Sequence, residues 1–130
     1  MRPLELSVLP ETYAISRLEP FAPEPAWAQS GQIRSVTRTA QELSIVCRQD
    51  AVPGGVVSEG GWRALKVAGT LDFSLIGVLA SLAEPLAQAR VSLFALSTHD
   101  TDYVLVKAEA LQGAIAALTA AGHRFAESSR

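Results

Sequence analysis

The amino-acid sequence predicts an α+β fold made of two tandem ferredoxin-like units (βαββαβ order), with antiparallel sheets and the helices on one face. Two observations predict this class. The second half of the chain reads strand, helix, strand, strand, helix, strand. The first half repeats part of that order, because "SVTRTAQELSIV" (35–46) aligns with "ALSTHDTDYVLV" (95–106) at an offset of 95 − 35 = 60 positions. We therefore expect a degenerate N-terminal unit in residues 1–60 and a complete C-terminal unit in residues 61–130.

The N-terminal unit is predicted to be rich in strands and poor in helix. Its first two strands alternate apolar and polar side chains, with Pro10-Glu11 as the expected turn between them. The stretch "EPAWAQ" has room for only one short helical turn. The glycine-rich stretch 52–61 is the expected flexible boundary between the units. Strands are expected at residues 4–9, 12–18, 33–37 and 43–47.

The C-terminal unit carries an amphipathic helix with a stripe of leucines. Between Leu75 and Leu86 they recur at steps of four, three and four residues, and Asp72 or Ser74 would suit the N-cap. Pro85 removes a backbone donor, so the helix should bend or shift its last turn there. The other predicted elements are strands at 61–68, 91–96, 103–107 and 123–125, and a second helix at 109–121 that stops at Gly122.

Composition excludes several classes of protein. The 130 residues include 11 Lys and Arg against 13 Asp and Glu, a net charge of −2 without a basic block, so we expect no nucleic-acid partner. No apolar segment is long enough to span a membrane, and the charged N-terminus does not resemble a signal peptide. We therefore expect a soluble cytoplasmic protein. The single cysteine, Cys47, lies in an apolar run and is expected to be a small buried residue.

A polar stretch, "STHDTD" (97–102), separates two apolar runs and carries more polar groups than a turn needs. Its last three residues resemble a DxD metal motif, yet Asp and Thr also satisfy the backbone of tight turns. His99 and His123 suit surface or capping roles better than catalysis. No phosphate-binding loop, nucleophile elbow, HExxH motif or cysteine pair is present. We therefore expect no enzymatic activity, no metal and no cofactor.

The start of the leucine-rich helix is a candidate binding site. Asp72-Phe73-Ser74 leads from a strand into a helix N-terminus, where unpaired N–H groups and a partial positive charge suit a carboxylate. Gly77 has no side chain, so a ligand could approach the helix closely. The pattern is equally consistent with ordinary capping by Asp72 or Ser74 and with packing at Gly77.

A resemblance favours ligand binding. The stretches "LDFSLIGVLASLAEPLA" and "ALSTHDTDYVLV" resemble the ACT domain, and in particular the tandem-ACT subfamily that includes the mammalian cytosolic arginine sensors; "SVTRTAQELSIVC" resembles the upstream part of the same subfamily. The resemblance implies a regulatory protein that binds a free amino acid or a similar small effector where two ACT units pack side by side.

The same resemblance implies the composition of the site and the partners. The ligand would lie between the helix start and a neighbouring hairpin, with Asp100 and Asp102 shaping the turn or receiving a cationic group. We expect a homodimer, also because the mean hydropathy of +0.22 is high for so small a chain, and a regulated partner protein. A structural interaction module without a ligand is the alternative. The implied ligand-binding residues are Asp72, Phe73, Ser74, Leu75, Gly77, Ser97, Thr98 and Asp100.

Overall fold

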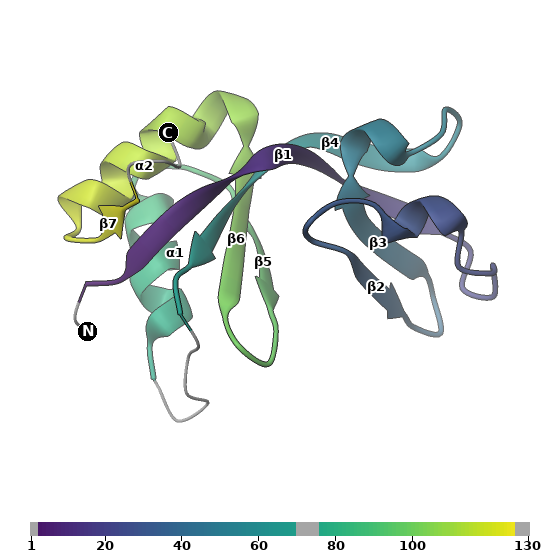
Figure 1. Cartoon of the computed structure of the whole chain (residues 1–130), viewed down its shortest axis with the longest axis horizontal. Helices are drawn as coiled ribbons and strands as arrows, with labels where there is room; N and C mark the ends of the chain where they lie inside the picture. Colours follow the sequence, from purple (N-terminus) through teal and green to yellow (C-terminus); the bar gives the residue numbers. More distant parts are fainter. Residues whose placement is uncertain (1–2, 70–75, 127–130) are drawn as a thin grey trace. The chain divides into compact units, whose positions relative to one another are not determined.

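A computed structural model of the chain describes residues 3–69 and 76–126 (Figure 1). The chain divides into two compact units. The larger unit comprises Met1–Pro10 and Arg63–Arg130, and the smaller unit comprises Glu11–Trp62. The predicted α+β class is confirmed: strands pair mainly in antiparallel order, and both α-helices of the described chain belong to the larger unit.

The larger unit has the order strand, helix, strand, strand, helix, strand that the sequence predicts, with one strand added. Its sheet order is β7-β1-β4-β6-β5. A ferredoxin-like sheet places its last strand beside its first, but here β1 lies between β4 and β7, and Glu5 of β1 pairs in parallel with Arg124 of β7. The elements are β1 (Glu5–Leu18, of which residues 5–10 belong here), β4 (Val57–Val67, residues 63–67 here), α1 (Val78–Gln88), β5 (Phe94–Ser97), β6 (Asp102–Lys107), η3 (Ala108–Ala110), α2 (Leu111–Ala120) and β7 (Arg124–Phe125).

The core of the larger unit lies between the sheet and the two helices. Alternate residues of neighbouring strands are buried against the helices, which places both helices on one face of the sheet. Each buried leucine contributes about 1.5–3 kcal/mol to stability. The predicted leucine stripe is confirmed for its described members. The core residues are Leu6, Val8, Leu65, Val67, Val104 and Val106 from the strands, and Leu82, Leu86, Leu111, Ala114, Ile115 and Leu118 from the helical face.

The smaller unit replaces both helices of such a fold with single 3₁₀ turns, as the sequence predicts for "EPAWAQ". Its sheet order is β2-β3-β1-β4. Its core consists of Ala28, Leu43, Ile45 and Cys47, with Trp27 packed against them. The elements are residues 11–18 of β1, η1 (Ala26–Gln29), β2 (Ser35–Arg38), β3 (Leu43–Arg48), η2 (Gln49–Ala51) and residues 57–62 of β4.

Two local expectations are wrong. The predicted turn at Pro10-Glu11 does not form, because β1 is one continuous strand. Pro10 lies after Leu6, the last residue paired with β7, and before Tyr13, the first residue paired with β3. Proline is tolerated where a strand edge has no ladder bond to lose. The glycine-rich stretch 52–61 is not a loop throughout, since β4 begins at Val57.

The hairpins β2–β3 and β5–β6 have the same turn. Thr39 donates its N–H to the Glu42 carbonyl at 2.8 Å, and Thr98 donates to Thr101 at 2.9 Å. In each turn the threonine hydroxyl accepts the N–H of the residue three positions on, at 3.1 and 3.3 Å. The two threonines are 98 − 39 = 59 positions apart. The two turns therefore correspond in structure at an offset of 59 rather than the predicted 60.

Candidate functional site

Helix α1 begins at a glycine in the left-handed conformation. The N-cap is Gly77, with φ of 83°, and its carbonyl accepts the Ser81 N–H at 2.9 Å. The prediction of an N-cap at Asp72 or Ser74 is therefore wrong. A Cβ placed on Gly77 would meet nothing within 4 Å, so the described chain requires glycine here for its backbone angle rather than for space. The predicted site residues Asp72, Phe73, Ser74 and Leu75 lie outside the described residues.

The tip of the β5–β6 hairpin presents the second group of predicted site residues. Ser97 pairs with Asp102 at the end of the ladder. The Thr98 hydroxyl is used within the turn, where it lies 3.2 Å from the Thr101 carbonyl and accepts the Thr101 N–H. Asp100 is exposed, and its Oδ1 lies 2.9 Å from Nδ1 of His99. Ser97, Thr98 and Asp100 are all exposed at the tip, and of these Thr98 has its hydroxyl bonded within the turn.

A buried threonine ties this tip to the strand that leads to α1. Thr101 is 5% exposed, and its hydroxyl donates to the Val67 carbonyl at 2.8 Å. Val67 is the last residue of β4, and β6 lies beside β4 in the sheet. The hairpin tip therefore lies next to the point where the chain leaves β4 toward α1. Figure 1 shows the β5–β6 turn and the start of α1 at the same end of the larger unit.

The sequence does not predict this role of Thr101. From sequence alone, the whole stretch 97–102 is expected to serve turn chemistry or ligand contact. A threonine before an apolar strand gives no local signal that its hydroxyl is directed at a carbonyl 34 residues earlier. The predicted residues Ser97 and Thr98 nevertheless belong to the hairpin tip that Thr101 holds beside the end of β4.

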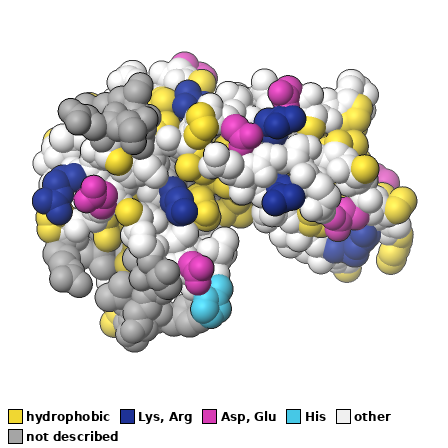
Figure 2. Space-filling model, viewed as in Figure 1, with side chains coloured by type: hydrophobic (Ala, Val, Ile, Leu, Met, Phe, Trp, Pro, Cys, Tyr) yellow, Lys and Arg dark blue, Asp and Glu magenta, His cyan; other side chains and the backbone are white. Residues whose placement is uncertain are grey.

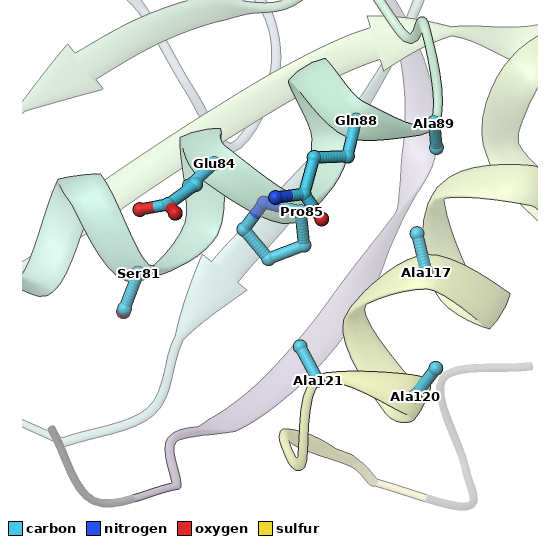
Figure 3. A pocket seen from close by; sticks show the side chains of 8 residues that line it. All are labelled: Ser81, Glu84, Pro85, Gln88, Ala89, Ala117, Ala120 and Ala121. Atoms are coloured by element: carbon cyan, nitrogen blue, oxygen red, sulfur yellow. The ribbon is translucent and has the colours of Figure 1, made fainter.

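A groove runs between α1 and α2 on the helical face of the larger unit. Figure 3 shows the α1 side chains on one side of it and three small α2-side residues, Ala117, Ala120 and Ala121, on the other. Its volume is about 570 Å³, and Glu84 is the charged side chain that lines it. None of the predicted site residues contributes to this groove. Its remaining lining residues are Ser81, Pro85, Gln88 and Ala89.

Charge and metal-binding groups are sparse in the part of the chain that the structure describes. On the face shown in Figure 2, basic and acidic side chains are interspersed rather than gathered into one patch. Within residues 3–69 and 76–126, no three His, Cys, Asp or Glu side chains are grouped to hold a metal ion. No described helix has the length and apolar character needed to cross a membrane.

The larger unit has the fold of an ACT domain, a ferredoxin-like βαββαβ sheet, here with one added strand. The family model of the ACT domain matches residues 57–120, and a second family model, described as an N-terminal domain, matches residues 11–55.

Solved structures agree with this class. A protein from Agrobacterium tumefaciens is 36% identical over 97% of this chain and 94% of its own, with a TM-score of 0.91. At this identity and coverage the chain belongs to the same family as that protein, and it carries an ACT domain.

More distant structures share the fold alone. A Vibrio cholerae protein of unknown function, described as a possible transport protein, is 18% identical with a TM-score of 0.73, over 91% of this chain and 89% of its own. The ligand-free regulatory subunit of aspartate kinase from Thermus thermophilus is 15% identical with a TM-score of 0.59, over 90% and 96%. ACT domains are regulatory modules, so the match of residues 57–120 to the ACT-domain family model supports a regulatory role with a small-molecule ligand.

Proposed function

We propose that this protein is a regulatory module without catalytic activity that binds a free amino acid or a similar small effector where two ACT units meet, as a homodimer in the cytoplasm. The observation that carries the proposal is the ACT domain over residues 57–120, in which Thr101 holds the hairpin tip beside the end of β4. The chain then acts on a partner protein through the effector-bound state.

The ligand carboxylate is proposed to bind at the start of α1. The first N–H groups of a helix have no partner within it and carry a partial positive charge. Gly77 is the N-cap of α1, and Asp72, Phe73, Ser74 and Leu75 precede it in the chain, separated from it by Ile76. The exposed groups of Ser97 and Asp100 at the hairpin tip would then meet the ammonium group or the side chain of the ligand.

The two units are proposed to be an N-terminal ACT-like unit in residues 1–60 and an ACT domain in residues 61–130, of which only the second binds ligand. The shared hairpin turns support a common origin. In the smaller unit the corresponding tip is bonded to its own chain: Arg17 Nη2 donates to the Gln41 carbonyl at 2.9 Å, and Arg38 donates to the Pro20 carbonyl. Arg38 stands 59 positions before Ser97, so a short side chain replaces it in the larger unit.

An exposed apolar side chain supports the proposed homodimer. Ile76, next to the start of α1, is 89% exposed. A large apolar side chain in that position would be covered if a second copy packed against this end of the larger unit. Asp100, exposed at the hairpin tip, would supply an acidic group for a cationic part of the ligand.

A thermal-shift screen against the twenty amino acids tests the proposal. A ligand at one hundred times its dissociation constant stabilises the folded state by about 2.7 kcal/mol, which raises the melting temperature measurably. A dimer adds a second signature, because its melting temperature rises with protein concentration. If no amino acid at millimolar concentration shifts the transition, the structural interaction module is the better account.

The variant Ser74→Asp tests the position of the carboxylate. An acidic residue before a helix is favourable in the free protein, so folding should survive. Repulsion from the ligand carboxylate should weaken binding by about 1–3 kcal/mol. The matched control is Ser92→Asp, an exposed serine in the loop after α1, which should bind as the parent does. Unchanged affinity in Ser74→Asp would show that the carboxylate binds elsewhere.

A further inference from the structure

The C-terminus of α2 directs a histidine into the interior of the larger unit. Gly122 has φ of 105°, a left-handed angle that follows the helix. Its N–H donates to the Thr119 carbonyl, and the His123 N–H donates to the Leu118 carbonyl, both at 3.0 Å. This pair of bonds is the Schellman motif, which fixes the backbone of His123. The His123 side chain is buried, with 5% of the residue exposed, whereas the sequence predicted a surface or capping role.

Both ring nitrogens of His123 are bonded to backbone groups of other elements. Nδ1 accepts the N–H of Leu4 at 3.1 Å, and Nε2 lies 3.1 Å from the carbonyl oxygen of Ser81. A backbone N–H only donates and a carbonyl only accepts, so the ring is neutral and carries its proton on Nε2. The Leu4 carbonyl accepts the N–H of Arg124, so both backbone polar groups of Leu4 are hydrogen-bonded to this part of the chain.

The Ser81 carbonyl needs this donor because of a proline. In an α-helix each carbonyl accepts the N–H four residues later, and four residues after Ser81 stands Pro85, which has no N–H. Figure 3 shows Ser81 and Pro85 on successive turns of α1. Instead of breaking, α1 continues past Pro85 to Gln88. The Nε2–H of His123 supplies the hydrogen bond that the proline withholds.

We infer that His123 is a positioning residue for the start of α1: its Nε2–H replaces the helical donor missing at Pro85 and so fixes the first turn of the helix. That turn runs from Gly77, whose carbonyl accepts the Ser81 N–H, to Ser81, whose carbonyl accepts the histidine. The functional meaning rests on the proposed function, since it takes the start of α1 as part of the ligand site. The contact itself stands on the geometry of the free protein.

A double-mutant cycle between His123→Asn and Pro85→Ala tests the inference in the ligand-free protein. Asparagine keeps an acceptor for the Leu4 N–H but has no donor that reaches Ser81. The Ser81 N–H bonds the Gly77 carbonyl in the same turn, so its hydrogen exchange reports on how well that turn is held. This exchange should become about tenfold faster in His123→Asn, a change equivalent to about 1.4 kcal/mol. Pro85→Ala restores the helical N–H, so in that background the same substitution should change the exchange less than about twofold.

The matched control is His99→Asn, which alters the other histidine of the chain at the exposed hairpin tip and should leave Ser81 exchange unchanged. Equal effects of His123→Asn in both backgrounds would overturn the inference. The contribution of the histidine would then not depend on whether residue 85 has a backbone N–H.

The ring nitrogens of the parent protein give a test that needs no variant. Their ¹⁵N signals at about pH 7.5 should show a proton on Nε2 and none on Nδ1. A ring protonated on Nδ1 would overturn the inference even if His123→Asn failed to fold. Because neither measurement uses a ligand, the inference and the proposed amino-acid site fail separately.

Discussion

Replacing Thr101 with valine should loosen the hairpin tip by removing one hydrogen bond and little else. Valine has the same branched shape, so packing around the 5%-exposed side chain is retained, while the 2.8 Å bond to the Val67 carbonyl is lost. A buried carbonyl left without its donor costs about 1–3 kcal/mol. With a urea dependence of about 2 kcal/mol per molar, the unfolding midpoint should fall by about 0.5–1.5 M and the slope should not change.

The assay can follow the two units separately. The helices α1 and α2 belong to the larger unit, so far-ultraviolet circular dichroism reports mainly on it. The two tryptophans of the chain, Trp27 and Trp62, both belong to the smaller unit, so their fluorescence reports on that unit. The lower urea midpoint of Thr101→Val should appear in the dichroism transition. An equal shift of the midpoint measured by fluorescence would show that the two units unfold together.

Thr119→Val removes a hydroxyl from an exposed position on α2 and should change stability by less than about 0.5 kcal/mol. A Thr101→Val protein with the midpoint of the parent would show that the Val67 carbonyl is satisfied without the hydroxyl. The role given to Thr101 in holding the hairpin tip beside β4 would then be wrong.

Two further predictions concern backbone conformation and thiol chemistry. Gly122→Ala should lower the free energy of unfolding by about 1–2 kcal/mol, because φ at Gly122 is 105°. Gly113→Ala, in an open position of α2, should raise it by about 0.5–1 kcal/mol. Equal effects of the two substitutions on thermal unfolding would refute the Schellman motif at Gly122. Burial raises the pKa of the Cys47 thiol. Alkylation of Cys47 at about pH 8 should therefore be slow in the folded protein and fast in urea. Rapid labelling of the native state would contradict the burial of Cys47.

Much of the larger unit could be predicted because its signals are local. Leu82 and Leu86 belong to a helical stripe that is legible from spacing alone, and both are buried on α1. Gly122 ends α2 as predicted, since a left-handed residue after a helix favours glycine. Helix–strand order and hairpin positions depend on such short-range patterns, and these expectations are confirmed.

The errors arose where partners distant in sequence decide the structure. Pro10 looks like a turn residue from its neighbours, but the pairings on either side of it keep β1 extended. His123 bonds a residue 119 positions away and another 42 positions away, so no local pattern could have assigned its role. The sequence predicts too early a start for α1, because Asp72 and Ser74 are good capping residues, whereas the backbone angle at Gly77 determines the N-cap.

Two of the long-range bonds that the sequence did not predict lie on either side of the segment that the ACT resemblance assigns to the ligand. Before it, the Val67 carbonyl at the end of β4 is held by Thr101; after it, the Ser81 carbonyl in the first turn of α1 is held by His123. Each bond fixes a backbone position that would otherwise be free to shift with the helix or the hairpin. In the proposed function, fixing both flanks in advance would lower the conformational entropy that the ligand has to remove on binding. Under that proposal Thr101 and His123 influence affinity without contacting the ligand, and their substitution should weaken the proposed amino-acid binding even where the fold survives.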